Sequence, residues 1–241
     1  GDVGLHVAKA IYGLREKGIP TEGKSVEDLA HYIGICYSFG NDQYEINPSA
    51  KSEIDRLNAV LYTMEDEEIK KLYFWGFDIT MEAFEKLYTL LGTTFDHYFL
   101  ESKTAPIGSA IVKKHTGSIF EESEGAIVFK GEKYDPSLHT RVFITKAGLP
   151  TYETKEIGLM EEKMRTVPNI DLSLVITANE QLQYMKVVSR AISLIYTDLR
   201  VHMRHIVHGM MRFAEGKMSS RLGNIITGES LITDTIDRIA D

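Results

Sequence analysis

The chain has 241 residues, of which 43% are hydrophobic and 26% are charged, proportions typical of a globular protein. This composition excludes collagenous, low-complexity and disordered proteins, and no apolar stretch approaches the roughly 20 residues that a membrane helix needs. The single cysteine excludes an intrachain disulfide and a zinc site built from cysteines. We therefore expect a reducing, cytoplasmic location, no membrane partner and no protein-bound zinc.

The charge of the chain is unevenly distributed. Its formal net charge of -8 argues, taken alone, against a dedicated nucleic-acid-binding domain. The stretch 186–221 nevertheless contains seven basic and two acidic residues, a local charge of +5. Two acidic runs, 65–68 and 121–124, are interpreted as solvent-exposed faces.

The first ninety residues are predicted to be almost entirely helical, because their apolar residues recur at helical spacing. Ser25 followed by Asp28 is typical of a capping motif at the start of a helix. The triplet Gly40-Asn41-Asp42 is expected to end that helix. The expected helices cover residues 6–17, 25–39, 48–64, 67–76 and 80–91.

An aromatic cluster surrounds the single tryptophan: Tyr73, Phe74, Trp75 and Phe77. Such a cluster could stack nucleic-acid bases, or it could belong to the core or to an interface. Its density favours packing, because bulky aromatic side chains mostly serve that purpose. Cys36 lies on an apolar helical stripe and is expected to be a core residue.

The middle of the chain changes in character near Phe95. Strands are predicted over residues 95–99, 126–130 and 141–145, where aromatic or β-branched residues gather. A helix is expected to follow, at about residues 153–165.

The clearest unit comes next. The continuous apolar run Leu172–Thr177 is typical of a strand buried on both faces. A helical pattern over 182–195 and a second strand over 205–211 complete a βαβ unit, which implies a parallel sheet and an α/β fold. Ligands of such sheets bind beyond the carboxyl ends of the strands, here residues 177–181 and the loop after Met211.

Two sets of residues could carry chemistry. Lys217, Ser219, Ser220 and Arg221 offer cations and hydroxyls suited to a polyphosphate, although a solvated surface turn has the same composition. Tyr152 and Glu156 are four residues apart, so on a helix they share a face. An aromatic ring beside a carboxylate suits a guanidinium group; the alternative is a half-buried tyrosine next to a surface acid.

Three histidines, His202, His205 and His208, recur every third residue. Three metal ligands would need to share one face, whereas His205 and His208 lie on opposite faces of a strand. We therefore expect no metal site, and instead a packed or ribose-adjacent His208.

The string Lys217-Met218-Ser219-Ser220-Arg221 resembles the KMSKS signature of class I aminoacyl-tRNA synthetases. Three further blocks, at 1–9, 148–159 and 179–181, resemble arginyl-tRNA synthetase, and the resemblance runs in order across essentially all 241 residues. It implies a partial Rossmann-type parallel sheet, the second nucleotide-binding half, with a helical and small β insertion.

The resemblance also implies an activity for the parent enzyme, that of an arginine–tRNA ligase. Such an enzyme activates arginine with ATP, accompanied by Mg²⁺, to arginyl-adenylate and pyrophosphate, and then transfers arginine to tRNA(Arg). By resemblance, arginine binding falls to Tyr152, Glu156 and Gln181; ATP binding to His208, Gly209, Met210 and Lys217; and catalysis to Lys217, Ser219, Ser220 and Arg221.

Two positions depart from the family pattern. Glu156 stands where the family normally has aspartate, so one extra methylene must be accommodated. Ser220 stands at the second lysine of the signature, and Arg221 at its final serine. Lys217 and Arg221 are therefore expected to share the contacts with pyrophosphate, and arginine can grip a phosphate through two hydrogen bonds.

The resemblance predicts four segments: a helical segment after the first Rossmann half (1–64), a connective insertion (65–140), the second Rossmann half (141–230) and a stub before the anticodon-binding domain (231–241). The sequence has no HIGH-type motif, so the chain is expected to be an excised piece without aminoacylation activity. The alternatives are another HIGH-superfamily nucleotidyl transferase and a non-catalytic interaction module. Self-association through the exposed edge of a truncated sheet is a further hypothesis.

Overall fold

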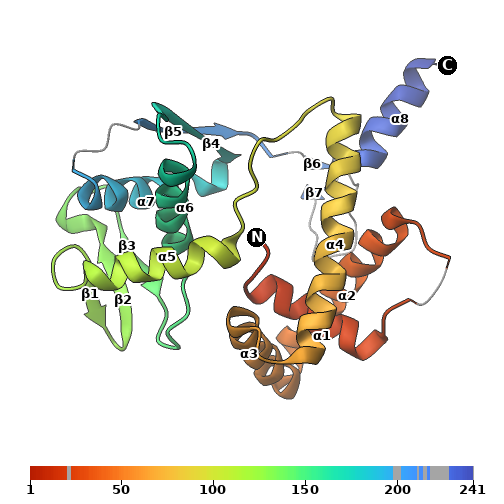
Figure 1. Cartoon of the computed structure of the whole chain (residues 1–241), viewed down its shortest axis with the longest axis horizontal. Helices are drawn as coiled ribbons and strands as arrows, with labels where there is room; N and C mark the ends of the chain where they lie inside the picture. Colours follow the sequence, from red (N-terminus) through yellow and green to blue (C-terminus); the bar gives the residue numbers. More distant parts are fainter. Residues whose placement is uncertain (21–22, 198–201, 211, 214–215, 218–227, 241) are drawn as a thin grey trace. The chain divides into compact units, whose positions relative to one another are not determined.

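The structure, a computed structural model, describes residues 1–20, 23–197, 202–210, 212–213, 216–217 and 228–240. The chain divides into two compact units. Unit 1 comprises Gly1–Tyr98 and Met211–Asp241, and unit 2 comprises Phe99–Met210. The mixed α/β composition predicted from the sequence is confirmed (Figure 1). None of the described helices combines the length and the apolar character needed to cross a membrane.

Unit 1 is built mainly from helices. Four of them, α1 to α4, follow one another along the chain, and the C-terminal part adds a two-stranded antiparallel hairpin and one more helix (Figure 1). The elements are α1 (Leu5–Lys17), α2 (Val26–Ile46), α3 (Pro48–Thr63), α4 (Glu67–Leu90), β6 (Arg212–Phe213), β7 (Gly216–Lys217) and α8 (Gly228–Ala240).

Helix α2 begins as predicted and ends later than predicted. Ser25 and Asp28 form a complete capping box at its N-terminus. The predicted break at Gly40-Asn41-Asp42 is wrong, because tertiary contacts favour the helix there. A Cβ on Gly40 would lie 2.0 Å from the carbonyl oxygen of Lys9, and the Lys9 ammonium donates a hydrogen bond to Asn41 Oδ1 at 2.9 Å.

Helix α4 is a single element, so the prediction of two helices over 67–76 and 80–91 is wrong. The chain stays helical between them, and the Thr80 hydroxyl donates to the carbonyl oxygen of Gly76 at 2.7 Å. Tyr73 is buried in the core of unit 1, and Trp75 and Phe77 pack against it, whereas Phe74 is half-exposed. The packing role predicted for this cluster is thus confirmed for three of its four members, and Cys36 is buried as predicted.

Unit 2 combines helices with two sheets. Strands β1, β2 and β3 form an antiparallel sheet in that order, and β4 pairs with β5 in parallel (Figure 1). The elements are α5 (Glu101–Lys114), β1 (Glu121–Ser123), β2 (Ala126–Lys130), η1 (Gly131–Lys133), β3 (Thr140–Ile144), α6 (Tyr152–Thr166), β4 (Leu172–Ala178), η2 (Asn179–Gln181), α7 (Leu182–Ile195) and β5 (His202–His208).

In this region one predicted strand is wrong and one helix was not predicted. Residues 95–99 form no strand, because Phe95 packs edge-on against Tyr88, with ring centroids 4.6 Å apart, instead of entering a sheet. Helix α5, which contains Pro106, was not predicted. The acidic run at 121–124 lies partly in β1, where the Glu121 carboxylate pairs with two lysines of β2 and η1.

The predicted βαβ unit is confirmed: α7 connects β4 to β5, and Leu172 pairs with His202 through to Ala178 with His208. The second strand begins three residues before its predicted start and ends at His208. The prediction that β4 is buried on both faces is wrong. Ser173 is buried, but Leu174 and Ile176 on the other face are 49% and 65% exposed, so the strand has one open apolar face.

Candidate functional site

The start of α6 is fixed by its connection to strand β3. A tight turn follows Ile144, in which the amide of Gly148 donates to the carbonyl oxygen of Thr145 at 2.8 Å. Gly148 adopts a φ of 77°, a conformation that favours glycine. The Thr151 hydroxyl then lies 2.8 Å and 3.0 Å from the carbonyl oxygens of Val142 and Phe143. These contacts hold the first turn of α6 against β3.

Helix α5 fixes the other side of α6. The two helices cross at Gly108 and Gly158, where a Cβ on either glycine would lie 1.9 Å from a backbone oxygen of the opposite helix. Close backbone approach of this kind leaves little freedom for either helix to move. Buried Thr154 adds a hydrogen bond of 2.5 Å from its hydroxyl to the carbonyl oxygen of Phe143. The first two turns of α6 are therefore a rigid platform for side chains.

Two predicted site residues, Tyr152 and Glu156, lie one turn apart on this platform. The Tyr152 ring is 49% exposed, and Glu156 is partly buried. The ammonium of Lys155 lies 4.9 Å from the centroid of the Tyr152 ring and 2.6 Å from Glu101 Oε2. The ring thus already carries a cation on its face, as expected of a cation–π site.

The Glu156 carboxylate stands in an unusual environment. Burial raises its pKa, the Lys163 ammonium opposes that rise, and the Glu101 carboxylate adds to it. No cation among the described residues lies within salt-bridge distance of Glu156. The Lys163 ammonium instead lies 3.3 Å from the Ser173 hydroxyl. Glu156 is therefore a partly buried carboxylate that retains capacity for a cationic ligand.

Residues that the sequence analysis did not single out complete this cluster. Arg141 of β3 pairs with Glu153 at 2.8 Å, and its guanidinium lies 5.4 Å from the centroid of the Tyr184 ring. Burial raises the pKa of Tyr184, and the carboxylates of Glu156, Glu153 and Glu101 raise it further. Tyr184 therefore lies among the acidic groups, although it belongs to α7. The only sequence signal is its position three residues after Gln181, one turn along α7.

The carboxyl edge of the parallel sheet holds the other predicted residues of unit 2. Because Ala178 pairs with His208, η2 and the segment after β5 emerge at the same edge. Gln181 ends η2 and is exposed. The Nδ1 atom of His208 lies 2.8 Å from the carbonyl oxygen of Gly209. A Cβ on Gly209 would meet nothing within 4 Å, and Met210 is 46% exposed.

The three histidines of β5 do not share a face. His202 and His208 are exposed, whereas His205 is partly buried and its Nε2 lies 2.8 Å from the Thr177 hydroxyl. Among the residues that the structure describes, no group of three potential ligands could hold a metal ion.

The structure describes only part of the predicted phosphate loop. Lys217 belongs to β7, whose backbone pairs antiparallel with Arg212 of β6. Ser219, Ser220 and Arg221 lie outside the described residues. The structure thus places Tyr152 and Glu156 one turn apart on α6, Tyr184 near the Glu156 carboxylate, and Gln181 beside the end of β5.

Comparisons with known proteins identify the family. A model of the catalytic domain of class I (R) tRNA synthetases matches residues 11–241. An arginine–tRNA ligase of Borreliella afzelii is 28% identical over 99% of this chain and 42% of its own length. One of Clostridium perfringens is 24% identical over 99% of this chain and 41% of its own length. The chain therefore spans about two-fifths of the length of these curated relatives.

Two solved structures share the fold. Arginyl-tRNA synthetase from Plasmodium falciparum matches 96% of this chain and 36% of its own with a TM-score of 0.65 and 16% identity. The Thermus thermophilus enzyme matches 98% of this chain and 44% of its own with a TM-score of 0.62 and 18% identity. At these identities the likeness supports the fold alone. Because the family model covers nearly the whole chain, the chain belongs to the class I (R) tRNA synthetase catalytic domains.

Proposed function

We propose that this chain is part of an arginine–tRNA ligase that works in the cytoplasm. The parent enzyme activates arginine with ATP to arginyl-adenylate and pyrophosphate, and then transfers the arginyl group to tRNA(Arg). One observation carries the proposal. In a member of this family, Tyr152 and Glu156 lie one turn apart on a rigid helix and present an aromatic face and a carboxylate that makes no salt bridge with any described residue.

Arginine binding is assigned to unit 2. The guanidinium group stacks on the Tyr152 ring and donates two parallel hydrogen bonds to the Glu156 carboxylate. The Lys155 ammonium also lies 4.9 Å from the ring centroid, and its pairing with Glu101 offsets its repulsion of the bound guanidinium. The exposed Gln181 contacts the other end of the amino acid. A bound guanidinium also favours the charged form of Glu156, whose burial is otherwise unfavourable.

ATP, with its Mg²⁺, is assigned to the carboxyl edge of the parallel sheet. The backbone of Gly209 and Met210 contacts adenine and His208 contacts ribose; the exposure of all three supports this assignment. Lys217 and Arg221, with the hydroxyls of Ser219 and Ser220, hold the departing pyrophosphate. Their part in catalysis is to position the phosphates and to stabilise the charge that develops on them.

The β4–α7–β5 unit is proposed to be the second half of a Rossmann-type sheet. The exposed apolar side chains of Leu174 and Ile176 support this, because such a face is normally covered when the sheet is complete. The 241 residues contain no HIGH-type motif. We therefore propose that the isolated chain makes no arginyl-tRNA.

Calorimetric titration of the 241-residue chain with arginine tests the amino-acid site. Citrulline, which has the shape of arginine without its charge, serves as the matched ligand. Glu156→Gln keeps the size of the side chain and removes its charge, so we expect the affinity for arginine to fall about ten-fold or more. Glu122→Gln, at the exposed middle position of β1, is the control and should leave the affinity unchanged.

Three results would contradict the assignment. Citrulline could bind as tightly as arginine, Glu156→Gln could bind arginine like the parent chain, or the control could lose binding to the same extent. Formation of arginyl-tRNA by the isolated chain with arginine, ATP and tRNA(Arg) would contradict only the proposal that the isolated chain is inactive.

A further inference from the structure

A second site lies in unit 2, formed by α7, β5 and the loop that follows η1. It is a pocket of about 590 Å³, whose lining includes Leu182, Lys186 and Arg190 of α7. The other wall contains Asp135, Ser137 and Leu138. The volume lies within the range of small-molecule sites, and none of these residues was assigned to arginine or ATP.

The lining of this pocket is cationic and rich in donors. Lys186 and Arg190 are two positions of the +5 stretch, and they lie one turn apart on α7. Ser137 and Ser189 contribute hydroxyl groups to the lining. The single carboxylate, that of Asp135, accepts a hydrogen bond of 2.8 Å from the backbone amide of Ser137. No salt bridge joins it to either cation among the described residues.

Two buried polar atoms of this lining have no hydrogen-bond partner. They are Nε of Arg190 and Nδ1 of His205, counted among the described residues. His205 uses its other ring nitrogen toward the Thr177 hydroxyl. The Arg190 guanidinium lies 5.7 Å from the centroid of the Tyr134 ring, which supports it from one side. A buried donor without a partner, as Arg190 Nε is among the described residues, is unfavourable, so a ligand that accepts hydrogen bonds would stabilise this arrangement.

We propose that this pocket binds the phosphate group of a small phosphorylated molecule. The Arg190 guanidinium, which lines the pocket, and the Lys186 ammonium grip the phosphate oxygens. The hydroxyls of Ser137 and Ser189 supply further donors. The remainder of the ligand packs on Leu138 and Leu182, since the pocket is far larger than a phosphate ion. None of the residues that line this pocket belongs to the arginine cluster.

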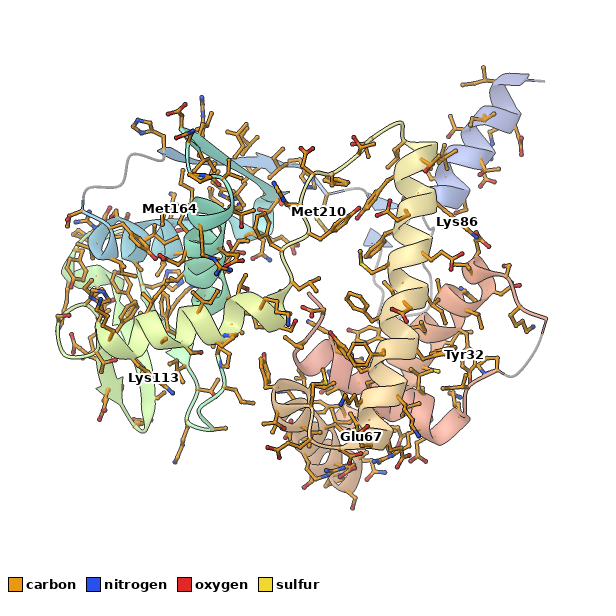
Figure 2. All side chains as sticks on the ribbon, viewed as in Figure 1. Tyr32, Glu67, Lys86, Lys113, Met164 and Met210 are labelled. Atoms are coloured by element: carbon orange, nitrogen blue, oxygen red, sulfur yellow. The ribbon has the colours of Figure 1, made fainter. Side chains whose placement is uncertain are left out.

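Titration of the 241-residue chain with glycerol 3-phosphate, followed by ³¹P NMR, tests the proposal. Lys186→Gln and Arg190→Gln should each weaken binding about ten-fold or more. Asp135→Asn should strengthen it several-fold, because it removes the one negative charge of the lining and keeps an acceptor for the Ser137 amide. Lys113→Gln, on an exposed position of α5 (Figure 2), is the matched control and should have no effect.

Further variants and ligands distinguish binding at this pocket from binding at other phosphate contacts. Lys217→Gln should leave binding of glycerol 3-phosphate intact. Lys186 is exposed, so its variant keeps the test decisive even if Arg190→Gln fails to fold by circular dichroism. The proposal is overturned if glycerol 3-phosphate does not bind saturably, if Lys186→Gln binds it like the parent chain, or if a phosphodiester oligonucleotide binds at this site and the monoester does not.

Discussion

Each unit of this protein contains a pair of helices that cross at glycines. In unit 1, a Cβ on Gly13 of α1 would lie 2.1 Å from the carbonyl oxygen of Cys36 in α2. In unit 2, a Cβ on Gly158 of α6 would lie 1.9 Å from the carbonyl oxygen of Thr104 in α5. Both crossings bring two backbones together more closely than any side chain would allow.

The two crossings differ in the polar groups that they bury. Near the α1–α2 crossing the buried polar pair is Lys9 and Asn41, which bond to each other. Beside the α5–α6 crossing lie Glu153 and Lys155, whose partners come from β3 and from α5. The same packing solution thus consolidates an interior in unit 1 and positions charged groups next to a candidate site in unit 2.

Substitution of the crossing glycines should have the largest effect. Gly158→Ala forces α5 and α6 apart and should destabilise unit 2 by about 3 kcal/mol, with loss of arginine binding. Gly13→Ala should destabilise unit 1 by a similar amount. The single tryptophan, Trp75, belongs to α4, so urea unfolding followed by its fluorescence reports on unit 1, while hydrogen exchange of α6 reports on unit 2.

The control for this pair is Gly34→Ala in α2, where a Cβ would meet nothing within 4 Å. It should leave both signals unchanged or slightly stabilise unit 1, because alanine favours helix. If Gly158→Ala left the exchange of α6 unchanged, the crossing in unit 2 would not depend on its glycine.

Loss of one cation should have the next largest effect on stability, and this effect should differ between the two units. In unit 2, Arg141→Gln leaves Glu153, whose side chain is 9% exposed, without its partner. We expect a loss of about 2 kcal/mol, since a buried charge left alone is unfavourable. In unit 1, Arg15→Gln affects a pair in which both side chains are more than a quarter exposed, so the loss should stay below about 1 kcal/mol. Equal losses in urea unfolding would show that the two pairs are equally screened.

Local periodicity was sufficient to predict much of the fold. It predicted α1, α3, α6 and α7 and the parallel pairing of β4 with β5, because apolar spacing directly reflects which face is buried. It failed where a distant contact overrides a local signal. Gly40 ends a helix in isolation, but here it allows the backbone of α1 to approach, so α2 continues.

The candidate site was predictable only in part. The spacing of Tyr152 and Glu156 places them on one face from the sequence alone. Glu101, Arg141 and Tyr184 come from three other elements, and no spacing rule brings them to α6. The pocket beside Lys186 and Arg190 was not predicted either, since the local charge of +5 indicates an anion-binding surface without saying where its members point.

The smallest effect concerns Glu53, a partly exposed acid of unit 1. Hydrogen bonds from Arg56 and then Arg15 lower the pKa of Glu53 from its ordinary 4.5 to about 2. A carboxylate with a lowered pKa stabilises the fold above pH 4.5, and this contribution is lost as the pH falls toward 2. Solvent screening limits it to about 1 kcal/mol or less. Glu53→Gln should therefore destabilise unit 1 slightly at pH 7 and have almost no effect near pH 2, as measured by Trp75 fluorescence. Glu122→Gln in unit 2 should leave that signal unchanged at both pH values. If the destabilisation by Glu53→Gln grew toward low pH, ionised Glu53 would not be the stabilising form.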